Sequence, residues 1–373
     1  MSAPRPASRL RILSFSTEVA RAGSAAEVHL MAIAQQLRAL GYAVTADWGD
    51  AISSRSGDIL LRHLRFPARA RRHDLVYFRA HPLDLVPVLA CRVTRVPYVL
   101  EINGDIDDLI TSRTALRPLG GLLRAFTRLQ RRWAAGVLAV STPLAESVIA
   151  GGLDPQRVCV VPSGGALALA TGRTPPEQHP PYALYFGHLA TRQGLDHVLR
   201  LRHSAYWPPG LALRIAGDGP LGPAIERHAA AHGCLDFDGP LRRERLEGVL
   251  ARASLTLSLQ DPSERRNHVM GLPLKIAESL LLGVPVVATD LSDVRTQAGG
   301  VPGCVLVSAP SSPEALGRAL STALSLRGSV PHPDTCAAMA ALSWESRGRR
   351  TSAFLASLGL TGSARRRGPD TRG

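Results

Sequence analysis

Lysine is nearly absent from this chain: of its 44 basic Lys and Arg residues, only Lys275 is a lysine. Arginine presents a planar fork of donors, whereas lysine is a compact point charge on a flexible stem, so the two cations are not interchangeable. A compact cation suits a phosphate oxygen that is reached from one direction. Lys275 is therefore a candidate anion-binding residue. The alternative is that it survived a compositional drift by chance and pairs with Glu278 on a solvated helix face.

Aromatic residues and closely spaced cysteines are also scarce. Aromatics make up only 5% of the chain, which argues against the large stacking platforms that bind single-stranded nucleic acid. The cysteines are odd in number, widely spaced and contain no CxxC pair, so we expect reduced core residues rather than a disulfide framework or a zinc site. They are Cys91, Cys159, Cys234, Cys304 and Cys336.

Long apolar stretches are missing as well. No run reaches the roughly 18 residues that span a bilayer, and the run at 280–289 is short and is interrupted by Gly283 and Pro285. The segment 1–6 lacks the apolar region of a signal peptide. Together with the cysteine usage, these absences predict a cytoplasmic protein. The first apolar run, 10–15, is not followed by GxGxxG, which argues against a dinucleotide-binding dehydrogenase.

Positive charge is what the chain has in excess. Its formal net charge of +14 favours anionic partners, namely sugar nucleotides, acidic lipids or nucleic acid. Nucleic acid is supported by charge alone, because the sequence contains no recognisable binding motif and few aromatics. At 373 residues with 45% hydrophobic content, two or three domains are expected, each able to bury a core.

Short apolar runs alternate with helical patterns along most of the chain, which predicts an α/β protein with parallel sheets covered by helices. A Pro-rich segment at 166–181 resembles a linker. We therefore predict an N-terminal domain at 1–165, a second domain at 182–345, a terminal helix at 346–360 and a basic tail at 361–373 that is too polar to fold alone. Ligands of such sheets lie beyond the carboxyl ends of the strands, so we expect the site in the cleft between the domains.

The individual elements follow from the same patterns. The predicted strands are 10–15, 42–45, 74–78, 98–102, 136–140 and 157–161 in the first half, and 182–186, 211–216, 234–237, 255–259, 284–288 and 304–307 in the second. The predicted helices are 25–40 with Gly41 as its C-cap, 84–93, 119–135, 144–149 capped by Ser141, and 337–358.

Small residues follow three strands of the second domain. Gly187, Gly217 and Gly239 each come just after a predicted strand, where glycine lets a ligand approach the backbone closely. Three such turns in succession, followed by the segments 271–278 (GLPLKIAE) and 282–289 (LGVPVVAT), predict a ligand site at this edge of the sheet.

Lys275 and Glu278 lie three residues apart after a Gly/Pro turn. If this stretch is helical, their side chains share one face. A cation and a carboxylate side by side can hold a phosphate and a sugar diol together. The alternative for Glu278 is an ordinary solvent-facing helix residue.

Taken together, these motifs resemble those of the family 4 glycosyltransferases, which have the GT-B fold, and the resemblance covers nearly the whole chain. It implies two Rossmann-like domains facing across a cleft, with the C-terminal helix returning to the N-terminal domain. It also implies retaining transfer from a nucleotide diphosphate sugar, with no required metal or cofactor. The matching segments are 185–189 (YFGHL), 215–220 (IAGDGP), 237–240 (FDGP) and 271–289 in the second half, and 11–15 (RILSF), 22–27 (AGSAAE), 96–104 (VPYVLEING), 140–141 (VS) and 160–165 (VVPSGG) in the first.

The functional residues of the family carry over position by position. The resemblance implies that Glu278 binds the nucleotide ribose, that 271–275 meets the sugar and diphosphate, and that Gly187 lies beside the diphosphate. It implies that 23–24 closes on the phosphates from the N-terminal domain and that 237–241 flanks the base. We predict that His188, Arg192 and Asn267 contribute where this chain departs from the family. The full set of predicted donor-binding residues is Gly23, Ser24, Gly187, His188, Arg192, Gly217, Gly239, Leu241, Asn267, Gly271, Leu272, Pro273, Leu274, Lys275 and Glu278. The candidate catalytic residues are Lys275, Glu278, Asn103 and His188, and no metal ligand is implied.

Four positions depart from the family pattern. His188 and Gln193 stand where the family often has Arg and Lys, and Met270 replaces a frequent glutamate. Asn103 replaces a frequent histidine; it can hydrogen-bond a sugar hydroxyl but cannot act as a general base. Arg192 could replace the lost charge. Because one preorganised donor to developing charge is worth about 3 kcal/mol, a chain that lacks two is expected to be slow or differently built.

We therefore predict a hexosyl-type glycosyltransferase. It would move a sugar from a UDP-sugar or GDP-sugar to the hydroxyl of a glycan, a lipid-linked acceptor or a small molecule, with retention. The second domain would hold the donor and the first domain the acceptor. Two alternatives stay open: a sugar-nucleotide epimerase or hydrolase, and a non-catalytic relative that binds nucleotides or partner proteins.

The basic helix at 119–135 has two interpretations. Its arginines alternate with leucines, as expected of an interfacial helix on anionic lipid and equally of a core-packed helix with a solvated arginine face. The first interpretation predicts a protein that lies peripherally at the inner face of the membrane and acts on a lipid-linked acceptor.

Several polar residues near strand ends also have two interpretations. The acidic group 105–108 could bind a metal or cap a helix. His29 is expected to be structural, and Asp218 is expected to fix a turn.

Overall fold

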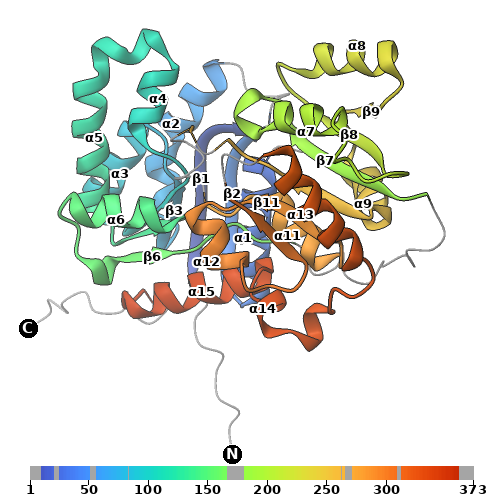
Figure 1. Ribbon diagram of the computed structural model, residues 1–373. Coiled ribbons are helices and arrows are strands. Elements are labelled where there is room, and N and C mark those ends of the chain that lie inside the picture. The colour runs from blue at the N-terminus through green and yellow to red at the C-terminus, as the bar shows by residue number, and fades with distance from the viewer. Residues whose placement is uncertain are drawn as a thin grey trace, which may run out of the picture. The chain divides into compact units, whose positions relative to one another are not determined.

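The computed structural model describes residues 10–20, 25–50, 56–82, 84–165, 180–261, 263–264, 271–308 and 312–360. The chain divides into two compact units: unit 1 is Met1–Pro162 with Arg347–Gly373, and unit 2 is Ser163–Ser346. Each unit contains one parallel six-stranded sheet with helices packed on it (Figure 1). This confirms the predicted α/β class. The linker at 166–181 and the tail at 361–373 lie almost wholly outside the described residues, so those boundaries stay predictions.

In unit 1 the strand order is β2-β1-β3-β4-β5-β6, and all neighbouring strands are parallel. The strands correspond to the six predicted ones, although β1 and β2 extend further: β1 is Arg11–Ala20, β2 Ala43–Asp50, β3 Leu75–Arg79, β4 Tyr98–Ile102, β5 Gly136–Ala139 and β6 Val158–Val160. The helices are α1 Ala25–Ala39, α2 Ser56–Ala70, α3 Leu85–Thr94, α4 Ile106–Ser112, α5 Gly120–Trp133, α6 Thr142–Ala150 and most of α15 Trp344–Ser357.

Three phenylalanines pack together in the core of unit 1. Phe15 of β1, Phe66 of α2 and Phe78 of β3 are fully buried. The ring centroids of Phe15 and Phe66 are 4.9 Å apart, and those of Phe66 and Phe78 are 5.7 Å apart. Because both faces of a parallel sheet are covered, its strands contain nearly continuous apolar runs, and this explains why short apolar runs predicted them.

The predicted caps of two helices in this unit are confirmed. Gly41 ends α1 with φ of +94°, and the N–H of Tyr42 donates to the carbonyl of Leu37 at 3.0 Å, as a glycine C-cap requires. Ser141 caps α6 by accepting from the N–H of Leu144 at 3.2 Å. Asp105 caps α4 by accepting from the N–H of Asp107 at 3.1 Å, so the capping interpretation of this acidic segment accounts for Asp105.

One prediction about helices is wrong, and helix α2 was not predicted individually. Helix α2 is absent from the predicted elements, because Pro67 lies inside it and proline normally interrupts a helical pattern. The single helix predicted over 337–358 is two helices, α14 Ala337–Ala340 and α15. Ser343 separates them: its Oγ accepts from the N–H of Ser346 at 3.1 Å and thereby starts a new helix.

Helix α15 returns to unit 1, as predicted. The hydroxyl of Tyr42 and Oγ of Ser352 are 2.7 Å apart. At Gly136 in β5, a Cβ atom would lie 2.5 Å from Leu358, so the region just after the helix packs directly on the sheet.

In unit 2 the strand order is β12-β11-β10-β7-β8-β9, again all parallel. The strands are β7 Tyr182–His188, β8 Ala212–Asp218, β9 Asp236–Gly239, β10 Leu255–Ser258, β11 Val286–Thr289 and β12 Cys304–Val307. The helices are α7 Leu195–Arg202, α8 Gly222–His232, α9 Arg243–Arg252, α11 Leu274–Leu281, α12 Ser292–Ala298, α13 Pro313–Ser325 and α14. Within the described part of the chain, no helix has both the length and the apolar character needed to cross a bilayer.

Candidate functional site

Lys275 lies in the first turn of α11, the helix that begins directly after Pro273. The residue is 9% exposed. Its Nζ lies 3.4 Å from Oε1 of Gln193 and 4.5 Å from the centroid of the Tyr185 ring. Burial and the nearby charge of Arg192 lower the pKa of Lys275 to about 7. The protein thus solvates this ammonium poorly.

The backbone at Gly187 passes directly beside Lys275. Gly187 has φ of +116°, and a Cβ atom there would lie 3.7 Å from Cε and 3.8 Å from Nζ of Lys275. The absence of a side chain at Gly187 leaves this side of the ammonium bare. The structure therefore brings together two of the predicted donor-binding residues, one from the end of β7 and one from α11.

Glu278 follows one turn later on α11 and is 5% exposed. Its Oε1 accepts a hydrogen bond from Nη1 of Arg243 at 2.5 Å, and Nε of Arg243 donates to Oε1 of Glu247 at 2.7 Å. Burial raises the pKa of Glu278, and Arg243 opposes part of that rise. Glu278 is therefore not a solvent-facing helix residue.

Arg243, at the start of α9, is not among the predicted site residues. Its i,i+4 spacing to Glu247 indicates a pair on a helix surface. No pattern in the sequence reports the contact with Glu278, because the two residues are 35 positions apart.

The glycines at the ends of β7 and β8 also allow neighbouring backbone segments to pack closely. Gly187 and Gly217 are paired in the sheet, and a Cβ atom at Gly217 would lie 1.9 Å from the carbonyl oxygen of Gly187. At Gly194 a Cβ atom would lie 1.3 Å from the carbonyl oxygen of Leu259. Gly239 differs, because its φ is +64° and nothing lies within 4 Å of such an atom.

Other predicted residues have varied surroundings. His188 is exposed, and its carbonyl accepts from the Tyr185 hydroxyl at 3.1 Å. Leu272 is 2% exposed and packs in the core beneath α11, while Leu241 packs against the core around Phe186. Asp218 fixes its turn, as predicted, by accepting from the N–H of Gly219 at 2.7 Å.

Other predicted residues form the turn before α11, and some lie outside the described residues. Gly271 has φ of +73°, and Pro273 and Leu274 are partly exposed at the start of α11. Three predicted donor-binding residues lie outside the described residues, namely Gly23, Ser24 and Asn267.

Asn103 lies in unit 1 at the end of β4. Its Nδ2 donates to Oε1 of Glu101 at 2.6 Å. The fully buried Glu101 also accepts from Tyr77 at 2.5 Å and Arg79 at 3.0 Å, and pairs with His29 at 2.9 Å. Burial alone would raise the pKa of Glu101, but His29, Arg79 and Tyr77 together hold it well below its usual range. His29 is thus structural, as predicted, and Asn103 is oriented by a buried carboxylate.

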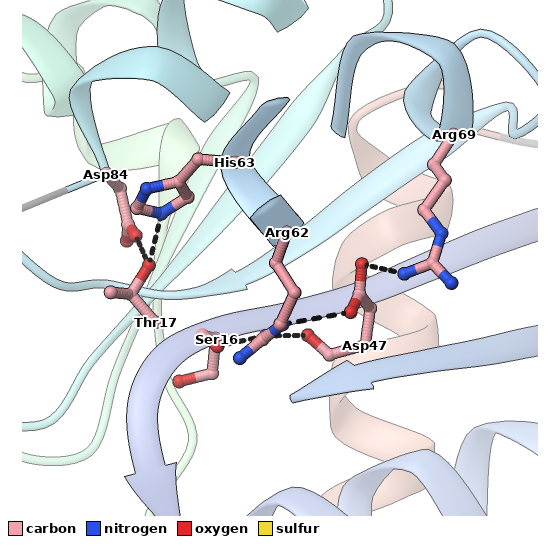
Figure 2. Close-up of polar contacts among 7 residues, drawn as sticks. All are labelled: Ser16, Thr17, Asp47, Arg62, His63, Arg69 and Asp84. Carbon is pink, nitrogen blue, oxygen red and sulfur yellow. Dashed lines mark hydrogen bonds and ion pairs between the residues drawn. The ribbon is translucent and has the colours of Figure 1, made fainter. Parts of the chain in front are cut away.

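Figure 2 shows a second polar cluster in unit 1, where β1 and β2 end. Nη2 of Arg62 donates to the carbonyls of Ser16 at 2.7 Å and Asp47 at 2.6 Å, and its Nε donates to Oδ1 of Asp47 at 3.2 Å. Arg69 pairs with Oδ2 of Asp47 at 2.5 Å. These contacts fix α2 to the carboxyl ends of two strands.

The same cluster contains a hydrogen-bonded series of three side chains (Figure 2). Oγ1 of Thr17 lies 2.5 Å from Oδ1 of Asp84 and 2.9 Å from Nε2 of His63. Asp84 is 0% exposed, and burial raises its pKa to about 7 against the opposing hydrogen bonds from Thr17 and His81. The three residues come from separate elements, so no spacing in the sequence predicts them.

Two family models match this chain. "Glycosyl transferases group 1" matches residues 180–325, and "Glycosyltransferase Family 4" matches residues 54–169. Between them they cover more than half of the chain. A comparison with curated proteins found no match.

Solved structures share the fold at low sequence identity. The structure of Anabaena HepE in complex with UDP-glucose is 17% identical, covers 94% of this chain and 100% of its own, and has a TM-score of 0.68. The apo structure of WaaB, a lipopolysaccharide outer core galactosyltransferase, is 14% identical and covers 93% and 99%, with a TM-score of 0.63. Sucrose-phosphate synthase from Thermosynechococcus elongatus is 14% identical and covers 94% and 99%, with a TM-score of 0.67.

These findings agree with the two parallel sheets, the returning terminal helix and the motif at 271–289. The chain belongs to the group 1, family 4 glycosyltransferases and has the GT-B fold.

Proposed function

We propose that this chain transfers a hexose-like sugar from a UDP-sugar to a hydroxyl acceptor, with retention of configuration. Family membership supports the transferase activity, and the complex of Anabaena HepE with UDP-glucose supports a uridine donor. GDP-sugar is the second candidate.

The observation that carries the proposal is the poorly solvated ammonium of Lys275 beside the bare backbone of Gly187. A diphosphate placed there would meet a cation whose hydrogen-bond contact with Gln193 is a long 3.4 Å. An anion within about 4–6 Å raises the pKa of a buried amine. Donor binding would therefore favour the protonated form of Lys275, whose pKa is about 7 without the donor. The ammonium would then stabilise the negative charge that develops on the leaving phosphate.

Glu278 would bind the other end of the nucleotide. Arg243 holds one of its oxygens at 2.5 Å, which fixes the carboxylate and favours its ionised form. A fixed carboxylate can accept hydrogen bonds from both hydroxyls of a ribose. Arg192 would supply the second positive charge, which the family pattern places at another position. Its charge is close enough to lower the pKa of Lys275.

Asn103 would be a positioning residue rather than a base. Its amide is held by Glu101, and an amide group is not basic enough to take up a proton at neutral pH. Transfer would then depend on stabilisation of the leaving group, which is the part of the reaction that Lys275 serves. His188, exposed at the end of β7, would add at most a hydrogen bond to the donor.

The acceptor side of the proposal involves a membrane surface. Helix α3 exposes Leu85, Val86, Leu89 and Val93, by 47%, 46%, 42% and 76% respectively. The neighbouring α5 exposes Leu122 by 68% and carries a basic face. Apolar side chains flanked by arginines suit an anionic bilayer. Failure of the protein to float with anionic vesicles at low salt would refute this part.

A donor screen followed by two variants tests the function. UDP, GDP, ADP and their sugars are first compared by thermal shift, and the best donor is then used in turnover assays with analysis of the anomeric product. Glu278→Ala and Lys275→Ala should each cut transfer at least about 100-fold. Arg318→Ala removes an exposed i,i+4 partner of Glu314 and is the matched control, with full activity expected. Normal transfer by both site variants would refute the site.

The same assay separates the alternatives. Free sugar without acceptor would indicate a hydrolase, and an altered sugar nucleotide would indicate an epimerase. Protection by a nucleotide without any turnover would favour a non-catalytic binding protein.

A further inference from the structure

Two histidines and a cysteine converge on the surface of unit 2. His203 ends α7, His228 lies in the last turns of α8, and Cys234 follows the glycine that ends α8. The two Nε2 atoms are 3.0 Å apart. Sγ of Cys234 lies 3.9 Å from Nε2 of His203 and 3.7 Å from Nε2 of His228.

These separations match the spacing of ligands around one zinc ion. Zinc binds imidazole nitrogen at about 2.0–2.1 Å and thiolate sulfur at about 2.3 Å, usually in a tetrahedron. Such bonds place two nitrogen ligands about 3.3 Å apart and a nitrogen and a sulfur about 3.6 Å apart. Each of the three separations in the protein is within about 0.3 Å of these values, so small side-chain movements suffice.

The protonation of the two histidines also suits a metal. Facing Nε2 atoms cannot both carry a proton without repulsion, so at least one presents a lone pair to the other. Neutral imidazole is the form that binds a metal, and Cys234 would lose its proton on binding.

His232 packs beside the cluster but is not one of its three ligand residues. Its ring stacks on that of His228, with centroids 4.4 Å apart and planes at 23°, and its Nδ1 lies 3.1 Å from the carbonyl of His228. It therefore lies against His228 but contributes none of the three ligand atoms, and it offers a natural control.

The cluster lies at the edge of the sheet opposite the donor loops. His203 and His228 are near the carboxyl ends of their helices, and Cys234 comes just before β9 begins at Asp236. In a parallel sheet with connecting helices, that position is the amino edge of the strands, whereas Gly187 and Gly217 are at the carboxyl edge. A metal here would act on stability rather than on transfer.

We propose that His203, His228 and Cys234 form a zinc site, with water as the fourth ligand, that joins the end of α7 to the α8–β9 connection. The proposal is independent of the proposed function. Spacing alone predicted no zinc site, because the set has a single cysteine and its two histidines are 25 residues apart on different helices.

Metal binding by the full-length, tag-free chain tests the site. Protein stripped with a chelator is titrated with Co²⁺, and Zn²⁺ is then added in competition. We expect one ion per chain, an absorption band from thiolate bound to cobalt, and a rise in melting temperature with Zn²⁺. Cys234→Ser should abolish the band, and His203→Gln should weaken Zn²⁺ binding at least tenfold. His232→Ala should keep the band.

Circular dichroism and the melting temperature of the stripped variants establish that they fold. Equal Zn²⁺ binding by the wild type, Cys234→Ser and His203→Gln, or no cobalt–thiolate band in the wild type, would overturn the site. Loss of sugar transfer on stripping, restored by Zn²⁺, would overturn its structural role, while unchanged transfer supports it. None of these outcomes depends on which nucleotide sugar the protein uses.

Discussion

Each unit buries a charged side chain at the carboxyl side of its sheet, and the two are treated in opposite ways. Glu101 in unit 1 is 2% exposed and has four polar partners within 3.0 Å: His29, Tyr77, Arg79 and Asn103. Lys275 in unit 2 is 9% exposed. Its polar contact with Gln193 is 3.4 Å long, and its other close neighbour is the ring of Tyr185.

The pKa values show the consequence of this difference. The partners of Glu101 overcome the effect of burial and hold its pKa below the usual range. At Lys275 the charge of Glu278 offsets only part of the effect of burial and of Arg192, and the pKa falls to about 7. A charge with all its partners present stabilises the fold, whereas a charge without them is suited to a ligand that arrives later.

Removing Glu101 should have the largest effect on stability. Glu101→Ala leaves His29 and Arg79 buried without their anion, which typically costs about 3–5 kcal/mol. Urea unfolding followed by circular dichroism measures the change. A loss below about 1 kcal/mol would contradict the view that the cluster is structural.

Removing Lys275 should act on activity and spare stability. Lys275→Met should lower transfer at least about 100-fold, since the cation that meets developing charge is lost. The free energy of unfolding should stay the same or rise, because a poorly solvated charge is replaced by an apolar side chain of similar length. Lys275→Arg is the control that keeps the positive charge but replaces the compact ammonium with a planar guanidinium. A loss of stability as large as that of Glu101→Ala would break the comparison.

Asp84 sharpens the comparison, because its buried carboxyl accepts hydrogen bonds from the Thr17 hydroxyl and the His81 N–H, whereas no ion pair among the described residues includes it. The pKa of Asp84 is about 7 in the folded protein, against an ordinary value of 3.8. Between these pH values the folded state therefore binds a proton that the unfolded state has released. This contribution to stability is complete below about pH 4 and is lost as the pH rises to 7. Arg62 and His63 are its ionisable neighbours.

Asp84→Asn should remove that dependence. Between pH 5.5 and 7 the variant should gain about 1–2 kcal/mol relative to the wild type, or a few degrees in melting temperature. Melting curves of both proteins across this range measure it. Parallel curves would mean that Asp84 is already ionised in the folded state.

The strands and the two key charged residues of α11 could be predicted because their signals are local. Apolar runs predicted all twelve described strands of the two sheets, and the spacing of Lys275 and Glu278 placed them on one helix. The fold of the C-terminal region was predicted less well, because the short capping contact at Ser343 interrupts an otherwise helical pattern.

The partners of the site residues could not be predicted, because they depend on contacts between distant positions. Arg243 meets Glu278 across 35 residues, and Gln193 meets Lys275 across 82. The series Thr17, His63 and Asp84 likewise forms only when β1, α2 and the start of α3 pack together. Residue types and spacings predict such elements but not which of their side chains touch.

The close passage of β7 and β8 limits how this protein could be re-engineered. A single methyl group at Gly217 would overlap the carbonyl oxygen of Gly187 and force the two strand tips apart. Changes in donor preference by directed evolution would then have to come from neighbouring positions with room to vary, such as the exposed His188, while the paired glycines stay invariant through every round of selection.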